Sequence, residues 1–273
     1  MLLKIKNKIL RKIEKLTKQN RTNKYMLTPE EYHKRLVDLK DKFKGKRCFI
    51  VGNGPSLNKC NLDLLKDEYS FAVNGIFYKT KEMGYRPTFY MVEDNHVVAD
   101  NLKSINNYKC KYKFFPYNYA NIISPDETTT FIPMDSGFYR ENHPYFCKPR
   151  FSKNVPDEIF AGQSVTIMQL QMAYHLGFSE VYLIGMDFSY ALPDSTKVEG
   201  CNYTSQEDDV NHFHPDYFGK GKKWHDPKLD RVLMNYEKCK KAFEEDGRKI
   251  YNATVGGKLE LFERRDYKKL FSN

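Results

Sequence analysis

A short apolar segment that ends in a glycine-bracketed turn most limits how this chain can fold. Residues 48–51 form an apolar run that Gly52 ends at once, which is typical of a buried parallel strand. Gly52 and Gly54 allow a sharp turn and a close approach to a ligand. Successive backbone N–H groups in such a turn can bind an anion. The segment therefore predicts the first strand of an α/β sheet, followed by a nucleotide-phosphate loop made of Gly52, Asn53, Gly54, Pro55 and Ser56. An ordinary strand-to-loop turn is the alternative.

The charge balance indicates the class of partner. The 273 residues include 45 Lys and Arg against 35 Asp and Glu, which gives a formal net charge of +10. A basic excess of this kind favours anionic partners such as nucleotides, acidic glycans or an anionic membrane surface. No nucleic-acid-binding motif accompanies the charge, so a nucleic-acid partner is not predicted. The length predicts one large domain.

The cysteines and the hydropathy indicate where the chain works. The six cysteines are scattered and include no Cys-x-x-Cys pair, which predicts reduced thiols in a cytoplasmic protein and neither a zinc site nor a disulfide framework. No apolar run approaches the ~20 residues that a membrane-spanning helix needs.

The first 24 residues form a separate unit in the sequence. Apolar residues recur there at helical spacing and lysines fill the intervening positions, which predicts a basic amphipathic helix. Such a helix can lie on the headgroups of an anionic membrane, at the inner face of the cell membrane. Packing on its own domain or on a second subunit of a homo-oligomer is the alternative.

The first half of the remaining chain reads as strands with polar ends. Thr28 with Glu31 three residues later predicts a capped helix over 28–42. Residues 69–73 predict a strand that ends at Asn74, and residues 87–92 predict a strand that ends at Glu93 and Asp94. Residues 110–117 predict a fourth strand, whereas residues 124–160 hold five prolines and are expected to be an irregular surface excursion.

The second half has a long insertion between regular elements. Residues 161–164 are expected to lead into a long apolar helix that ends near residues 175–177 with Gly177 as its stop signal, and residues 181–187 predict a buried strand. Residues 188–224 lack periodicity and are expected to form a lid. A helix from Asp226 to about residue 245, a strand at 249–252 and a basic helix at 261–271 follow. The pattern predicts a Rossmann-like, mostly parallel sheet with helices on both faces, as one catalytic α/β domain over residues 25–273 with an inserted lid.

Three segments in this order carry a resemblance to known families. They are Gly52–Ser56, residues 176–187 (Leu-Gly-Phe-Ser-Glu-Val-Tyr-Leu-Ile-Gly-Met-Asp), and His225 with Asp230 five residues later. Together they resemble bacterial lipooligosaccharide sialyltransferases of glycosyltransferase family 42, and the broader family named after the hydroxymethylpterin pyrophosphokinase MptE. The resemblance covers roughly residues 45–255. The sialyltransferases have a variant of the GT-A fold with a mobile lid, transfer sialic acid with inversion from a CMP-activated donor, and need no tightly bound metal.

The resemblance implies roles for individual residues. Asn53, Ser56 and Asn74 are expected against the donor nucleotide, and Ser164 near the substrate loop. His225 takes the place of the general base. Tyr190 and Tyr203 are the nearest candidates for the lid tyrosines that hold the donor phosphate, while Ser189 stands where one such tyrosine is expected.

Several alternatives stay open at this stage. His225 has a pKa range suited to accepting a proton at neutral pH, but a surface histidine beside Trp224 is the plain alternative. His212 and His214 could ligate a metal with Asp208 or Asp209, although two histidines without a clear third ligand are weak evidence. Asp187 could orient the lid or a ribose, or cap a turn. No metal site is predicted, and Mg²⁺ bridging a nucleotide stays open.

Three functions follow from these observations. The first is transfer of a sialic acid, or a related 2-keto sugar acid, from a CMP-activated donor to a glycan or lipid-linked glycan acceptor of the lipooligosaccharide or capsule type. The second is pyrophosphoryl transfer from ATP to a hydroxymethylpterin, which requires Mg²⁺. The third is a non-catalytic, membrane-associated nucleotide-binding protein.

Overall fold

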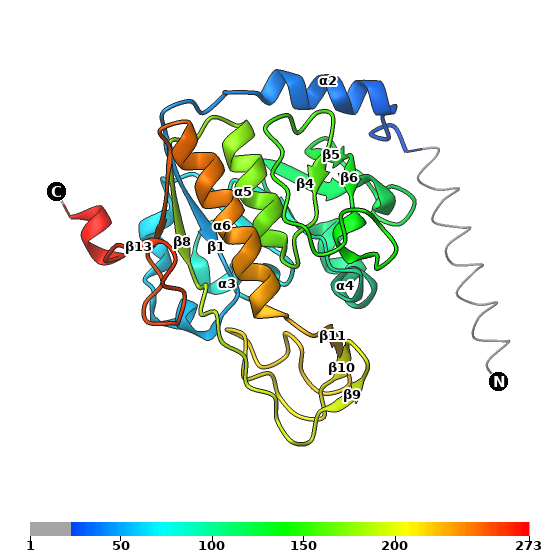
Figure 1. The fold of residues 1–273 in the computed structure, drawn as a ribbon, viewed down its shortest axis with the longest axis vertical. Coiled ribbons are helices and arrows are strands. Elements are labelled where there is room, and N and C mark those ends of the chain that lie inside the picture. Colours follow the sequence, from blue (N-terminus) through cyan, green and yellow to red (C-terminus); the bar gives the residue numbers. More distant parts are fainter. Residues whose placement is uncertain (1–22, 273) are drawn as a thin grey trace, which may run out of the picture.

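A sheet of eight strands, parallel at every pairing, forms the centre of the molecule (Figure 1). The computed structural model describes residues 23–272, so most of the expected N-terminal helix lies outside the described residues. The strands lie in the order β13-β12-β8-β1-β2-β3-β4-β5. Their bounds are β1 Arg47–Val51, β2 Ser70–Val73, β3 Phe89–Met91, β4 Tyr112–Pro116, β5 Thr129–Ile132, β8 Glu180–Ile184, β12 Lys249–Asn252 and β13 Glu263–Arg264. The predicted Rossmann-like, mostly parallel α/β fold is confirmed.

Both faces of the sheet are covered, because alternate side chains of each strand enter different apolar clusters. Cys48 and Ile50 of β1 lie in one cluster, and Phe49 and Val51 lie in the other. Helices α5 (Val165–His175) and α6 (Leu229–Glu245) contribute to the first cluster, and α4 (Asn95–Asn107) to the second. All eleven residues of α5 are buried, which explains why its sequence is largely apolar and has no charged face.

Helix α2 (Pro29–Leu39) begins as its sequence predicts. The Glu31 backbone N–H donates to Thr28 Oγ1 at 3.3 Å, and the Thr28 N–H donates to Glu31 Oε2 at 2.8 Å. This reciprocal pair satisfies two N–H groups that the first turn leaves without helical partners. The expected helix stop is also confirmed, since Gly177 follows α5 with a φ of +90°.

Three expectations about elements were wrong, and two helices were missed. The proline-rich residues 124–160 contain β5, which forms an edge of the main sheet, and the two-stranded parallel sheet of β6 (Met134–Asp135) and β7 (Ile159–Phe160). Residues 261–271 form β13 and one 3-10 turn at Lys268–Phe271 instead of a basic helix. Helix α6 begins at Leu229, after Lys228 in a left-handed conformation (φ 43°), and not at Asp226. The helices α3 (Thr80–Met83) and α4 were not foreseen.

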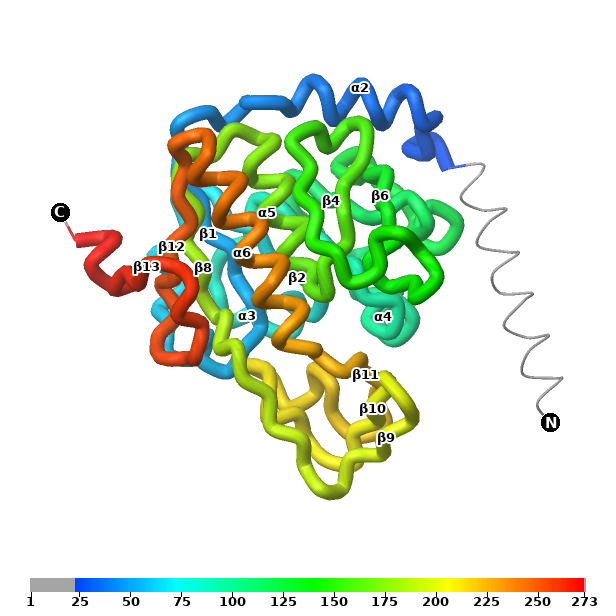
Figure 2. The backbone as a smooth tube through the Cα atoms, viewed as in Figure 1, coloured from blue at the N-terminus to red at the C-terminus, as the bar shows by residue number. Residues whose placement is uncertain are grey.

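The strand order reverses between β1 and β8. The chain adds β2 to β5 on one side of β1 and then returns to the other side with β8, which creates the crevice where ligands of open α/β sheets bind. Residues 188–224 follow β8 and contain the antiparallel strands β9 (Lys197–Glu199), β10 (Asn202–Thr204) and part of β11 (Lys223–His225). This segment projects beyond the carboxyl ends of β1 and β8, between β8 and α6 (Figure 2).

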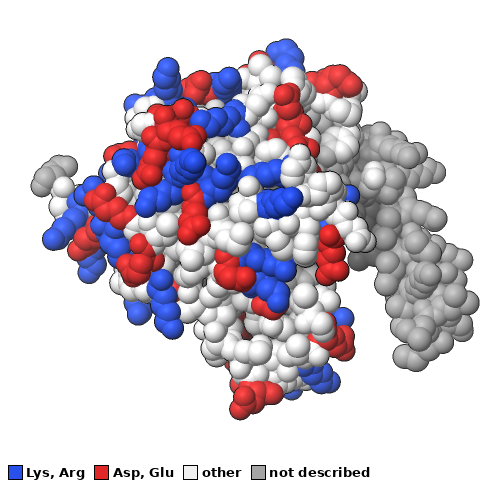
Figure 3. Space-filling view, viewed as in Figure 1, with Lys and Arg blue, Asp and Glu red and all other residues white. Residues whose placement is uncertain are grey.

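The visible surface carries charge of both signs. Acidic and basic side chains are interspersed over the face shown in Figure 3, and they do not form a single basic patch there. Among the helices of the described residues, none combines the length and the apolar character required to cross a membrane.

A buried ion pair joins β4 to the turn that leads into β5. The Nζ atom of Lys113 lies 2.6 Å from Asp126 Oδ2, and the lysine side chain is 1% exposed. Asp126 also accepts hydrogen bonds from Thr128 and Thr129. Burial opposes ionisation of this carboxyl, but the hydrogen bonds from Lys113 and the threonines prevail and lower the pKa of Asp126.

Replacing Asp126 with alanine should therefore destabilise the fold by roughly 2–3 kcal/mol, because the Lys113 ammonium would stay buried without its counter-charge. Urea unfolding monitored by circular dichroism measures this change. The control is Asp38→Ala, which removes the partner of the exposed Lys34 on α2 and should cost less than about 1 kcal/mol. Equal midpoints for the two variants would contradict a structural role for the buried pair.

Candidate functional site

A cavity of about 630 Å³ lies at the carboxyl ends of the central strands. Its size is within the range of small-molecule sites. The loops after β1, β2, β3 and β8, the starts of α5 and α6, and the lid all contribute to its wall. The predicted site residues among the lining residues are Gly52, Asn53, Gly54, Asn74, Ser164, Asp187, Tyr190 and His225. The cavity thus brings the glycine turn and the distant histidine to one place.

Three predicted residues do not line this cavity. Pro55 is exposed in the 3-10 turn that follows β1, whereas Ser56 is buried there and its hydroxyl donates to Asp187 Oδ2 at 2.6 Å. Tyr203 packs its ring edge-on against Trp224 at 4.7 Å within the lid. Ser164 lines the cavity as the N-cap of α5, where its side chain accepts a hydrogen bond from the Thr166 N–H.

Three of the backbone donors expected to bind a phosphate at the glycine turn bind protein oxygens instead. The Gly52 N–H donates to Ile184 O at 2.8 Å, and the Gly54 N–H donates to Gly185 O at 2.9 Å. The Ser56 N–H points at the Asp187 carboxylate, 3.2 Å from Oδ1. The protein itself therefore satisfies these three donors, and Asp187 supplies the negative charge that was expected from a ligand.

The space around Gly54 explains why the turn needs glycine. A Cβ atom at this position would lie 1.9 Å from Asp187 Oδ2, so only glycine admits the carboxylate. Of the roles considered for Asp187, turn capping is the one that its hydrogen bonds to Ser56 show.

Amide oxygens without partners gather at this cavity. Asn53 is 7% exposed, and its Nδ2 donates to Val73 O at 3.2 Å and to the Tyr217 hydroxyl at 2.9 Å. Its Oδ1 has no hydrogen-bond partner within the described part of the chain, and the same holds for Asn74 Oδ1 and Gln163 Oε1. A buried acceptor without a donor is costly, so these oxygens favour a ligand rich in N–H and O–H groups.

Unusual backbone conformations also concentrate here. Six non-glycine residues in the described part of the chain have positive φ, and four of them line the cavity: Asn74, Gln163, Phe188 and Lys228. Such conformations cost of order 1 kcal/mol or more each and cluster at functional sites.

His225 stands at the end of β11, against the start of α4. Its Nε2 lies 2.9 Å from Asn95 Oδ1, and its ring stacks on His96 with the centroids 4.3 Å apart. Because an amide oxygen only accepts, Nε2 carries the hydrogen and Nδ1 keeps a free lone pair. Burial lowers the pKa of His225, the Asp94 carboxylate opposes this change, and His96 adds to it. The net lowering favours a neutral imidazole at neutral pH.

The acidic residues after β3 are engaged by the protein. The Tyr139 hydroxyl donates to Glu93 Oε1 at 2.9 Å. Burial raises the pKa of Glu93 to about 7, an increase that Tyr139 reduces and the Asp94 charge reinforces. Asp94 caps α4 by accepting hydrogen bonds from the N–H groups of His96 and Val97. Within residues 23–272, no three His, Cys, Asp or Glu side chains converge as a metal-binding group.

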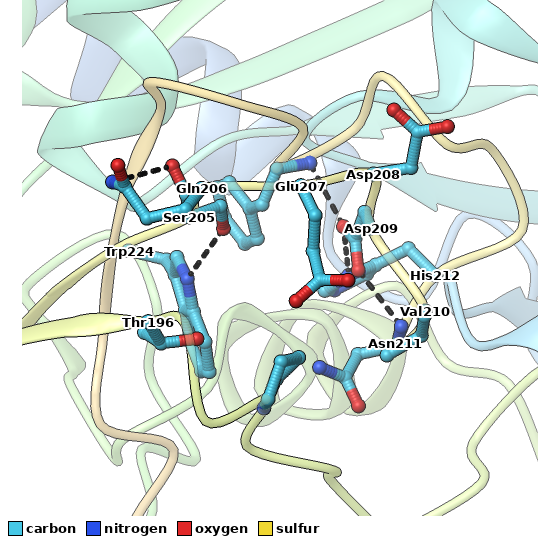
Figure 4. A pocket seen from close by; sticks show the side chains of 12 residues that line it. Thr196, Ser205, Gln206, Glu207, Asp208, Asp209, Val210, Asn211, His212 and Trp224 are labelled. Carbon is cyan, nitrogen blue, oxygen red and sulfur yellow. Dashed lines mark hydrogen bonds and ion pairs between the residues drawn. The ribbon is translucent and has the colours of Figure 1, made fainter.

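The lid contributes a second histidine that the sequence suggested only as a metal ligand. His212 Nδ1 lies 2.7 Å from Asp209 Oδ2, and both side chains are more than nine-tenths buried (Figure 4). His212 lines the large cavity, while Asp209 lies behind it. The spacing Asp-x-x-His in a loop without periodicity carries no sequence signal for such a pair.

Cationic groups lie at the α6 side of the cavity. Lys228 pairs with Asp226 at 2.7 Å, whereas Arg231 makes no ion pair with any described residue and stacks over Phe146 at 5.4 Å. The first turn of α6 has no side-chain cap, so its N–H groups and the helix dipole favour an anion at this wall.

Comparisons with known proteins found a similar solved structure and a matching family model. One similar solved structure is that of the MAf glycosyltransferase from Magnetospirillum magneticum AMB-1, with 15% identity and a TM-score of 0.48. The match covers 89% of this chain and 39% of that chain, so the present chain spans about two fifths of the other's length. No curated protein matches the sequence. A family model described as 6-hydroxymethylpterin diphosphokinase MptE-like matches residues 22–192. Because this match includes more than half of the 273 residues, the chain belongs to the MptE-like family.

Proposed function

We propose that this protein is an inverting glycosyltransferase. It moves a sialic acid or a related 2-keto sugar acid from a CMP-activated donor to a glycan acceptor of the lipooligosaccharide or capsule type. The observation that carries the proposal is that His225 and the residues after β1 and β2 line one lid-covered cavity at the switch point of the sheet. A base and a nucleotide-binding edge in one cavity meet the main requirement of group transfer.

The polar groups of the cavity suit such a donor. The unpartnered oxygens of Asn53 and Asn74 can accept hydrogen bonds from the amino group of cytosine and from ribose hydroxyls. On the opposite wall, Arg231 and the uncapped start of α6 suit a carboxylate, which 2-keto sugar acids carry. The donor therefore has complementary groups for both walls.

The transfer step needs one proton acceptor. The acceptor hydroxyl oxygen attacks the anomeric carbon from the face opposite the leaving group, and its proton passes to Nδ1 of His225. The bond from the anomeric carbon to the phosphate oxygen breaks, and its electron pair leaves with CMP. The hydrogen bond from Nε2 to Asn95 Oδ1 orients the ring and supports the imidazolium that forms.

The carboxyl groups of the site favour a reaction without a bound metal. Asp187 caps the glycine turn, Asp94 caps α4, and Glu93 binds Tyr139 with a pKa of about 7. A carboxyl with that pKa is partly protonated at neutral pH and is a poor Mg²⁺ ligand. The alternative is Mg²⁺ that binds through a nucleotide. Measurements with and without Mg²⁺, described below, distinguish this alternative from a metal-free reaction.

A second candidate is ATP-dependent pyrophosphoryl transfer to a hydroxymethylpterin. Membership of the MptE-like family favours it. The third candidate is a non-catalytic nucleotide-binding protein. For the glycosyltransferase, a lipid-linked acceptor at the inner face of the membrane and a homo-oligomeric state are extensions of the proposal that rest on the basic N-terminal sequence.

A panel of nucleotides separates these functions. CMP without metal should raise the melting temperature of the full chain by several degrees, because ligands that bind only the folded state stabilise it by mass action. CDP, UDP and ATP with and without Mg²⁺ complete the panel. Strictly Mg²⁺-dependent stabilisation by ATP alone would favour the pyrophosphokinase, and stabilisation by CMP without sugar transfer would favour the binding protein.

Replacing His225 with alanine should lower the transfer rate by ~10²–10⁴-fold, because a positioned general base contributes about that much. Transfer from CMP-sialic acid to a lactoside, followed by CMP release, measures the rate. The control is His33→Ala, which changes an exposed histidine on α2 that contacts Asp157 outside the cavity. Transfer by the His225 variant at the wild-type rate would remove His225 from the mechanism.

The same step predicts a pH dependence. The base works only when neutral, and its lowered pKa means that His225 loses its proton below the ordinary value of about 6.5. The rate should therefore rise with pH through a midpoint below 6.5 and stay level through neutral pH. An acid limb with a midpoint above 7 would contradict this assignment.

A further inference from the structure

Three backbone N–H groups of the glycine turn are not available to a phosphate. The N–H groups of Gly52, Gly54 and Ser56 already bind protein oxygens, and the Asp187 carboxylate lies within the turn. A nucleotide phosphate at this edge of the sheet would meet a negative charge with no free backbone donor from these three residues. A hydrogen-bond donor from outside the turn would therefore favour phosphate binding here.

The lid provides such a group next to Asn53. The Phe213 N–H donates to the Asn53 backbone oxygen at 2.9 Å, and the Asn53 side chain donates to the Tyr217 hydroxyl at 2.9 Å. The ring of His212 stacks on that of Tyr217, with centroids 4.0 Å apart and an interplanar angle of 7°. These contacts hold the imidazole of His212 against the ring of Tyr217, which Asn53 of the glycine turn binds.

The other contacts of His212 fix which nitrogen is free. Nδ1 is directed at Asp209 Oδ2 at 2.7 Å (Figure 4), and Phe218 packs edge-on against the ring at 5.1 Å. No described residue forms a hydrogen bond with Nε2, and the histidine lines the large cavity. A doubly protonated ring donates from both nitrogens, so it could bind Asp209 through Nδ1 and a phosphate in the cavity through Nε2.

Asp209 has backbone partners in the loop in addition to His212. It accepts hydrogen bonds from the N–H groups of Asn211 at 2.8 Å and Phe218 at 2.8 Å. These two bonds close the loop around the carboxylate and do not involve the side chain at position 212.

We infer that His212, oriented by Asp209, binds the phosphate of the donor nucleotide through Nε2. The inference rests on the proposed function and assigns a different role to each of the two histidines in the cavity. His225 receives the proton of the acceptor, and His212 stabilises the charge that grows on the phosphate oxygen as its bond to the sugar breaks. Asp209 is a positioning residue, because it acts only through His212.

Comparing CMP with cytidine tests this inference, because the two ligands differ only in the phosphate. Isothermal titration calorimetry measures both dissociation constants for the full chain. In His212→Ala the affinity for CMP should fall about 10- to 100-fold, as expected for a lost charge-assisted hydrogen bond. The affinity for cytidine should stay within twofold of the wild-type value, which would show that the site for the cytosine ring is intact.

His214→Ala is the matched control. His214 lies two residues away in the same loop, stacks on Tyr78 at 5.0 Å and is not among the residues that line the cavity. This variant should bind CMP as the wild type does. If His212→Ala loses its cooperative thermal transition, His212→Gln is measured instead, because its amide can still donate to Asp209 without carrying a charge.

Three outcomes would overturn the inference, alone or together with the proposed function. An unchanged preference for CMP over cytidine in the His212 variant would overturn the inference and leave the proposed function standing. An equal loss of both ligands would show a structural role and would also overturn it. A wild-type chain that binds neither CMP nor cytidine would overturn the proposed function, and the inference would fall with it.

Discussion

The close approach of the loops that leave β1 and β8 determines the rest of the site. A Cβ atom on Gly52 would lie 2.6 Å from the Gly185 oxygen, so the two backbones meet with no room for a side chain. The Gly54 N–H donates to the same oxygen, and Asp187 reaches across to Ser56. This crossing forms the floor of the cavity at the switch point of the sheet. The same contacts occupy the N–H groups of Gly52, Gly54 and Ser56, which a phosphate loop would otherwise offer to its ligand.

The floor and the lid are joined through Asn53. Its backbone oxygen accepts from the Phe213 N–H and its side chain donates to Tyr217, while Asn58 Nδ2 donates to the Phe213 oxygen at 3.0 Å. On the other side, His96 on α4 contacts Asn202 of β10 at 3.1 Å. The lid is therefore attached to both sides of the crevice, so groups from distant parts of the sequence have defined positions around one volume.

The sheet was largely predictable from the sequence because its inner strands are short apolar runs with polar or glycine ends. Helix caps were also predictable, because they depend on residues close in the sequence. Thr28 marks the start of α2 and Gly177 marks the end of α5. Strand β5 was missed because its neighbours are rich in proline, and the sequence does not show its parallel pairing with β4 or the ion pair between Lys113 and Asp126. The start of α6 was misplaced because Pro227 suggested a first turn, whereas Lys228 adopts a left-handed conformation.

The site was predictable only where strand ends specify it. Asn53, Asn74 and Asp187 follow strands, so topology alone brings them together. The hydrogen bonds that Asp187 makes to the turn were not visible, because a sequence does not show which donors the protein itself will satisfy. The Asp209–His212 pair was hidden for a related reason, since its geometry is created by an irregular loop with no period to read.

The burial of α5 on every side has a consequence for how the chain is made. Its eleven residues offer no polar face, and one of the surfaces that shields it is α6, which lies more than fifty residues later. A ribosome that has released α5 must still synthesise the whole lid before that shield exists. Until then α5 is an exposed, largely apolar helix on the nascent chain, which is the kind of surface that chaperones bind.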